Sequence, residues 1–252
     1  MEERELYIVQ SMHPPADQMT EALLGLFKGQ EYLTFVRESI RWHHEVIADI
    51  AKERGVTHFF CDGVTREHAE QTNKLLEDAF ELERTIGWLE KQWQDYGNNH
   101  KETSGLDIKT LGQRPAKMRY EFSTYRLKML RDIQKEILLK MYETEDEGIQ
   151  RIISSYDLKE RGITLQQIND VRDELVHRRI KQTAGERNIL FMGIDHKLRE
   201  FYQKGSEFTV ACARLDEKGL EYRYANRDAI PDFFREIVER RYAEMKERTV
   251  CL

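Results

Sequence analysis

Hydrophobic residues recur with two different periods along this chain, and the change between them predicts its layout. Short apolar runs typical of β-strands lie near both ends of the sequence. They cover residues 6–9, 56–61, 208–213 and 220–224. Longer stretches, in which apolar residues return every three or four positions, predict amphipathic helices. The pattern therefore predicts an α/β protein, in which a small, mainly parallel sheet is flanked by helices.

The first two predicted strands are joined by a predicted helix. Apolar residues stand at helical spacing over 36–51, and Gly55 ends the helix just before the second strand. A strand–helix–strand unit places its two strands parallel, with a right-handed connection. We therefore expect the strands at 6–9 and 56–61 to be neighbours. Near the C-terminus, two strands and an amphipathic helix over 230–248 form a β-β-α unit.

The middle of the chain predicts a long helical hairpin. Apolar residues alternate by four and three over 75–96, and a comparable stripe covers 118–141. The polar segment 97–114 separates them, and Pro115 predicts the start of the second helix. We expect the two stripes to pack on each other as an antiparallel hairpin. The alternative is that the seam pairs with a second copy of the chain and forms a homodimer.

These patterns divide the chain into a core and an insertion. Residues 1–65 and 183–252 form the α/β core, and residues 66–182 form a helical insertion that includes the hairpin. A capping box at Thr164–Gln167, in which a threonine precedes a glutamine by three residues, predicts that a further helix starts there.

The composition of the chain argues against several classes of protein. Charged residues make up 34% of the chain and the formal net charge is −6, which argues against nucleic acid as a general partner. The acidic N-terminus and the absence of a long apolar run predict a cytoplasmic protein without signal peptide or membrane span. The three cysteines are widely separated and form no CxxC pair, so neither a zinc ribbon nor a disulfide framework is predicted.

Candidate chemistry lies where the first two strands end. Pro14 and Pro15 cannot donate ladder hydrogen bonds, so the first strand must stop where His13 projects. The second strand ends at Asp62-Gly63. Ligands of open α/β sheets bind beyond the carboxyl ends of the strands, so we expect His13 and Asp62 to meet there. Together they could activate water or hold a divalent metal. The alternative is a loop histidine packed on Pro14 and an aspartate that opens a turn.

A charged group follows later in the chain. Gly185 ends a predicted helix, and Glu186-Arg187-Asn188 predicts the start of another. An arginine close to the sheet edge could hold an anion or a carboxylate, so Arg187 and Glu186 join His13 and Asp62 as candidate site residues. The alternative is an ordinary charge cluster at a helix start.

The order of these elements resembles a superfamily that contains the TraB pheromone-shutdown proteins, the TIKI metalloproteases, the ChaN-type haem-binding lipoproteins and the erythromycin esterases. The matching elements are Gln10-Ser11-Met12-His13, Asp62 and Glu186-Arg187-Asn188. Gln10 stands where the superfamily has glycine, and Asp62 where it has glutamate. No histidine follows 210–214, where the superfamily is expected to have one. The resemblance implies an α/β fold and a hydrolase that acts on a small molecule or a peptide.

Other patterns indicate different functions. Arg172 and His177 resemble the Arg-x(4–6)-His signature of HEPN ribonucleases, in which histidine transfers protons and arginine stabilises the charged transition state. That resemblance implies an all-helical fold. Glu174-x-x-His177 matches half of a di-iron motif, and His43-His44 with Asp49 is a weak metal pattern. For the two histidines we expect one to be buried and the other solvated. A non-catalytic ligand-binding module on the α/β scaffold remains the further alternative.

Overall fold

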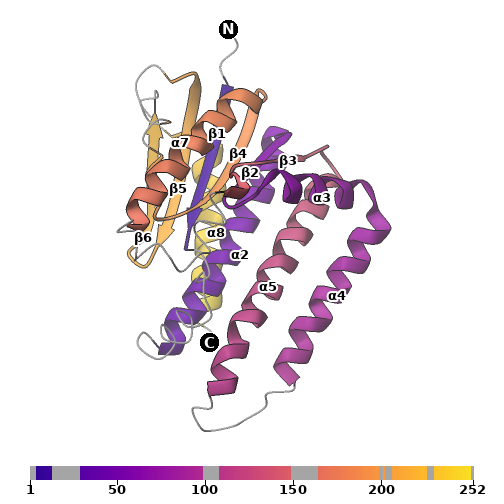
Figure 1. Ribbon diagram of the computed structural model, residues 1–252. Helices are drawn as coiled ribbons and strands as arrows, with labels where there is room; N and C mark the ends of the chain where they lie inside the picture. The colour runs from indigo at the N-terminus through magenta and orange to yellow at the C-terminus, as the bar shows by residue number, and fades with distance from the viewer. Residues whose placement is uncertain are drawn as a thin grey trace.

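A six-stranded sheet lies at the centre of the protein (Figure 1). The computed structural model describes residues 4–12, 29–98, 108–148, 164–198, 201, 206–225 and 230–250. The strands follow the order β3-β2-β4-β1-β5-β6, and every neighbouring pair is parallel except β5 with β6. They are β1 (Arg4–Ser11), β2 (His58–Cys61), β3 (Lys140–Tyr142), β4 (Arg187–Gly193), β5 (Phe208–Asp216) and β6 (Gly219–Ala225). The predicted α/β fold is confirmed.

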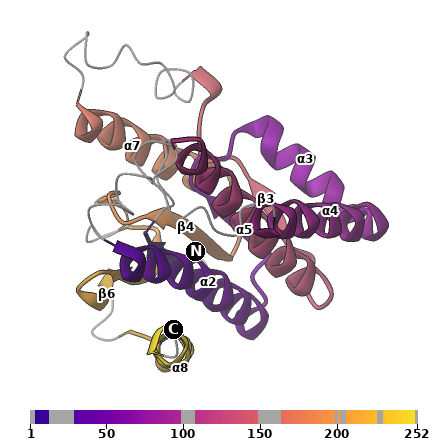
Figure 2. The same cartoon turned by 90° about the horizontal axis from the view of Figure 1, so that it is seen from below.

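Helices cover both faces of the sheet. They are α2 (Gly29–Arg54), α3 (Arg66–Glu77), α4 (Ala79–Asn98), α5 (Ile108–Gln134), α7 (Leu165–Thr183) and α8 (Asp232–Val250). Figure 2 shows α7 on one side of the sheet and α2 with α8 on the other. The chain is therefore built in three layers, helix, sheet and helix, with the sheet buried between them.

The alternation of side chains along β1 divides the interior into two cores. Tyr7 and Val9 belong to the core shared with α2, α5 and α8, whereas Leu6 and Ile8 belong to the core beneath α7. Successive residues of a strand point to opposite faces, so a strand covered on both sides is apolar throughout. Burial of one such aliphatic side chain contributes about 1.5–3 kcal/mol.

The prediction that a helix starts at Glu186–Asn188 is wrong, because strand β4 begins there. Residues 189–192 form an uninterrupted apolar run that is buried on both faces of the sheet, as a central parallel strand requires. The buried Asn188 side chain holds the entry to the strand. Its amide donates to the carbonyl of Glu5, and its oxygen accepts from the backbone N–H of Gly185.

The prediction that the first two strands are neighbours is also wrong. β4 lies between β1 and β2 and pairs in parallel with both. The two strands are parallel to each other, as predicted, but one strand spacing of roughly 4.8 Å separates each of them from β4. The carboxyl end of β4 therefore lies between the carboxyl ends of β1 and β2, which the sequence analysis predicts to be adjacent.

The predicted helical hairpin is confirmed. α4 and α5 lie side by side and extend away from the sheet (Figure 1). Leu82, Ile86 and Leu89 of α4 are buried in the same core as Leu130 and Ile133 of α5. The seam is thus filled within one chain, and homodimerisation stays a prediction.

The boundaries of the hairpin differ from those predicted. Asp78 separates α3 from α4, and its carboxylate accepts from the backbone N–H groups of Phe80 and Glu81. α5 begins at Ile108, so Pro115 lies inside the helix rather than at its start. Of the predicted 97–114 loop, residues 99–107 lie outside the described residues.

The segment 66–182 contributes directly to the sheet. Its strand β3 pairs with β2 through Phe59 and Met141, and its helix α7 buries Val176 and Ile180 beneath the sheet. The capping box predicted at Thr164 is confirmed, since its side chain and that of Gln167 bond reciprocally to the backbone. The sequence did not predict β3.

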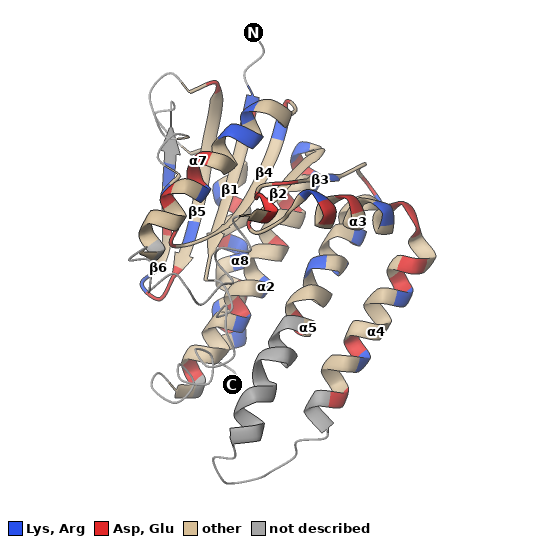
Figure 3. Ribbon diagram, viewed as in Figure 1, with Lys and Arg blue, Asp and Glu red and all other residues tan. Residues whose placement is uncertain are grey.

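Charged residues are frequent along the helices. Figure 3 shows acidic and basic positions interspersed along α4. Among the described residues, no helix is both long enough and apolar enough to cross a bilayer.

The entry into β4 can be tested with a matched pair of glycine substitutions. A Cβ added at Gly185 would lie 2.5 Å from the His58 ring, which stacks on Tyr142 at 4.7 Å. We expect Gly185→Ala to lower the free energy of unfolding by about 1–3 kcal/mol. A Cβ added at Gly87, on the exposed side of α4, would have no atom within 4 Å. Gly87→Ala should therefore raise the free energy of unfolding by about 1 kcal/mol or less. Urea unfolding measures the free energy of unfolding of both variants. Equal values would contradict the close approach of Gly185 to the His58 ring.

Candidate functional site

The carboxyl ends of β1, β4 and β2 bring polar residues to one edge of the sheet. Ser11 is the last residue of β1 and lies opposite Gly193, the last residue of β4. Asp62 follows β2, and its backbone N–H donates to the carbonyl of Phe191 at 2.9 Å. His196 comes three residues after β4. Three adjacent parallel strands thus deliver a hydroxyl, a carboxylate and an imidazole to the edge where such sheets bind ligands.

A buried group of charged side chains occupies this edge, and we name it the strand-end cluster. It consists of Asp62, Glu145, Arg172, Asp173 and His196. The Arg172 guanidinium, from α7, lies 2.5 Å from an Asp62 oxygen through Nη2 and 2.5 Å from a Glu145 oxygen through Nε. The Nη2 contact is a hydrogen bond, whereas the Nε contact is a close ion pair without hydrogen-bond geometry. One cation therefore joins two acids from different segments.

His196 lies between two carboxylates. Its Nδ1 is 2.5 Å from Oδ1 of Asp173, and its Nε2 is 3.3 Å from Oδ2 of Asp62. Because both ring nitrogens face carboxylate oxygens, the arrangement suits an imidazolium with two N–H donors. Burial by itself lowers the pKa of His196, but the hydrogen bonds with Asp173 and Asp62 outweigh it and raise the pKa to about 9. At neutral pH, His196 is a buried acid.

Backbone contacts fix the positions of these side chains. The buried Gln10 amide donates to the carbonyls of Gly193 and His196 at 3.1 and 2.9 Å, which holds the turn after β4. The other Asp173 oxygen accepts from the backbone N–H of Lys197 at 2.9 Å. Strand β1, helix α7 and the turn after β4 are thereby tied together at the site.

Glu145 is held next to Asp62 by the segment that follows β3. The Thr144 hydroxyl donates to the carbonyl of Cys61 at 2.6 Å. The backbone N–H groups of Thr144 and Glu145 both donate to the carbonyl of Val64. These hydrogen bonds to backbone carbonyls at the edge of the sheet position Glu145, the second acidic partner of Arg172.

A second polar pair lies on the opposite face of β1. The Ser11 hydroxyl is 2.7 Å from Nδ1 of His43, and both residues are fully buried. The His43 ring stacks on Phe191 at 4.0 Å. The expectation that one of the adjacent histidines is solvated is wrong, since His44 is also buried. Burial lowers the pKa of His44 to about 3, because the cation would lose its hydration.

The structure brings one of the predicted site residues into the strand-end cluster. Asp62 is a member, whereas His13 lies outside the described residues. Arg187 stands at the opposite, amino end of β4, where its guanidinium donates to the carbonyl of Arg54 at 2.8 Å. Glu186 precedes it. Arg187 stands five positions before the level of Asp62 along β4, or roughly 16 Å away, so the structure does not bring Arg187 and Glu186 to this site.

The arginine and histidine of the ribonuclease-like pattern have different surroundings. Arg172 contacts the two acids described above, and the His177 ring lies edge-on to Phe201 at 4.8 Å. Both lie on α7, which covers a sheet, and the all-helical fold implied by that resemblance is not the fold of this chain. Asp49, the acid of the weak metal pattern, pairs with Arg240 and Arg241.

The described part of the cluster does not suit the expected divalent metal. Each Asp62 oxygen faces a cationic group, Arg172 on one side and protonated His196 on the other. A metal would have to displace a proton from His196 and repel the guanidinium. Among the described residues, no group of three or more His, Cys, Asp or Glu side chains is placed to hold a metal ion.

The sequence interpretation missed His196 and Asp173. The signal was present, because the apolar run 189–192 ends at Gly193 and a histidine follows three residues later. Strand β1 has the same form, an apolar run with His13 just beyond it. The predicted helix start at 186–188 concealed this repetition, and the resemblance placed a second histidine only after 210–214.

Comparisons of the chain with protein-family models, curated proteins and solved structures give no match.

The charge of His196 gives the protein a pH-dependent stability. A group whose pKa is raised on folding contributes stability that is fully present below its unfolded value, about 6.5, and is lost as the pH rises through about 9. We expect wild type to exceed His196→Gln in free energy of unfolding by an amount on the order of 3 kcal/mol near pH 6. The excess should shrink between pH 7 and 9.5 in urea titrations.

His58 provides a control of opposite sign. Burial and the nearby Lys140 lower its pKa, so wild type should lose stability relative to His58→Gln as the pH falls below about 6.5. A pH-independent difference for His196→Gln would contradict a charged His196.

Proposed function

We propose that the chain is a hydrolase of acid–base type whose active site is the strand-end cluster. The observation that carries the proposal is the placement of His196 between Asp173 and Asp62, at the carboxyl edge of three adjacent parallel strands. A buried histidine with a raised pKa, held by one carboxylate and facing another, is typical of proton-transfer sites.

Each residue has a distinct role in the proposed reaction. The His196 imidazolium donates a proton to the leaving group, while the Asp62 carboxylate accepts one from the attacking water. The proton on Asp62 then returns to His196 across the 3.3 Å contact, which restores both groups. Asp173 is a positioning residue, because its two oxygens bind the imidazole and the backbone N–H of Lys197. Arg172 holds Asp62 in place and stabilises negative charge that develops beside it.

The resemblance to the TraB and erythromycin esterase superfamily supports this proposal. That superfamily has an acid after the second strand of the chain, where Asp62 stands, and it is expected to have a second histidine after the strand that corresponds to 210–214. In this chain a late histidine, His196, instead follows β4, and it lies beside that acid. The substrate in this proposal is a small molecule or a peptide, as the resemblance implies.

Hydrolysis assays on paired variants test the proposal. We expect wild type to hydrolyse at least one of p-nitrophenyl acetate, p-nitrophenyl phosphate and a fluorogenic dipeptide amide. His196→Gln should lower kcat/KM by about 100-fold or more, because the proton donor is lost. Asp173→Asn should lower kcat and shift the pH–rate profile, since it changes the partner that sets the pKa of His196.

Two residues on α7 provide controls. Glu174 is the neighbour of Asp173 and its side chain is 64% exposed, so Glu174→Gln should leave the rates unchanged. His177→Gln should also retain activity. Circular dichroism confirms that each variant is folded. Equal rates for wild type and His196→Gln on all three substrates would contradict the proposal, and RNA cleavage lost only in His177→Gln would favour a ribonuclease.

A further inference from the structure

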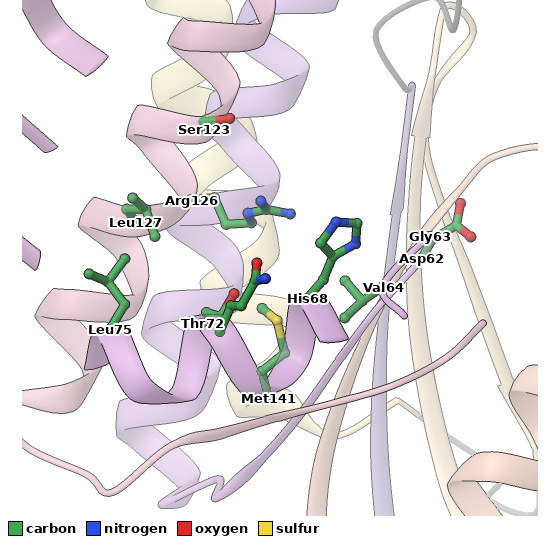
Figure 4. Close-up of a pocket in the computed structure, with 11 residues that line it drawn as sticks. Asp62, Gly63, Val64, His68, Thr72, Leu75, Ser123, Arg126, Leu127 and Met141 are labelled. Atoms are coloured by element: carbon green, nitrogen blue, oxygen red, sulfur yellow. The ribbon is translucent and has the colours of Figure 1, made fainter. Parts of the chain in front are cut away.

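A cavity of about 410 Å³ lies on the other side of the β2 carboxyl end, between α3 and α5 (Figure 4). Its floor is apolar and includes the buried Leu127 and Met141. Its mouth is polar, with His68 and Gln71 exposed on α3. The guanidinium of Arg126 reaches from α5 into the space toward His68. The cavity therefore combines an apolar base with a cation.

The positive charge of Arg126 has no acidic partner among the described residues. Its neighbours include the Cys61 thiol, His44 and, at 5.8 Å, the Phe122 ring, and its buried Nε has no hydrogen-bond partner among the described residues. Burial raises the pKa of Cys61 to about 11, so the thiol stays neutral beside it. Among the described residues that line the cavity, Asp62 is the sole acid. Its carboxylate points away from the cavity, toward Arg172 and His196.

An uncompensated cation in a partly buried position costs stability. The other described arginines at comparable depth are paired, as Arg172 is with Asp62 and Arg241 with Asp49. A guanidinium presents a planar fork of donors that matches a carboxylate or a phosphate. The Ser123 hydroxyl lies in the same cavity and can add a further donor to such an anion.

We propose that this cavity binds a small amphiphilic anion. The carboxylate or phosphate head binds Arg126 with help from Ser123 and His68, and the apolar part lies against Leu127 and Met141. This site is separate from the proposed hydrolase site, because the two lie on opposite sides of the β2 end and share only Asp62, whose carboxylate faces Arg172 and His196. The binding neutralises the one charge in the cavity that the described residues leave unbalanced.

Isothermal titration calorimetry with four probes tests the proposal: hexanoate, hexyl phosphate, inorganic phosphate and hexanol. We expect at least one of the two hexyl anions to bind with 1:1 stoichiometry, and the comparison of the two identifies the head group. Hexanol should bind that site about tenfold more weakly or worse, because it lacks the charge. Inorganic phosphate should also bind more weakly than the preferred hexyl anion, because it has no apolar part.

Substitutions locate the binding. Arg126→Met should weaken the preferred anion about tenfold or more, without lowering Tm, because it removes an unpaired charge. Gln71→Glu, at the exposed mouth, should also weaken the anion by repulsion and leaves the core untouched. Arg84→Met, a matched change of an exposed arginine on α4, should have no effect. His196→Gln should bind normally, so failure of the hydrolase proposal would leave this one standing. Absence of saturable binding by both hexyl anions, or equal affinity in Arg126→Met and Arg84→Met, would overturn it.

Discussion

The pairing of β4 with both β1 and β2 is the constraint on which the arrangement of this protein depends. Leu190 lies opposite Ile8 on one side and opposite Phe60 on the other, and all three are fully buried. A one-residue slip of β4 would turn each of its side chains to the other face of the sheet. It would also move the polar residues that flank the apolar run into the core. The register is therefore fixed by burial on both sides. It also fixes the height at which His196 leaves the sheet beside Asp62.

Charge compensation distinguishes two regions at the end of β2. On the α7 side, Arg172 and His196 contact three acids from three segments, and each carboxylate oxygen of Asp62 and Asp173 faces a described donor. Removing one partner from such a buried group leaves the others uncompensated, so its members depend on one another. On the α5 side, Arg126 faces a cavity toward which no acid of the described part of the chain is directed. The same strand end thus separates a group of paired ions from a cation that has no acidic partner among the described residues.

Much of the fold could be predicted because it is encoded locally. The period of apolar residues located β1, β2, β5, β6, α2, α8 and the hairpin, and the threonine–glutamine pair located the start of α7. β4 was mistaken for a helix, since a four-residue apolar run has no period that distinguishes a buried strand from a helix. β3 has three residues, of which Met141 is the buried one, and is too short to form a pattern. The candidate site was predicted only in part, because local patterns encode single elements and not the contacts between distant ones. Asp62 follows a recognisable strand, whereas Asp173 and Arg172 lie on a helix whose distance from that strand no local pattern encodes.

By itself, the sequence determined the class of fold, most of the elements and the edge of the sheet at which polar residues gather. The tertiary structure decided which strands are adjacent, and so which polar residues meet. Hydrophobic period and turn residues act over a few positions, because they reflect the geometry of one helix turn or one strand. The neighbours of His196 come from 23 and 134 positions away, Asp173 and Asp62 respectively. Their meeting depends on the order of strands in the sheet, which is set by the burial of whole elements against one another.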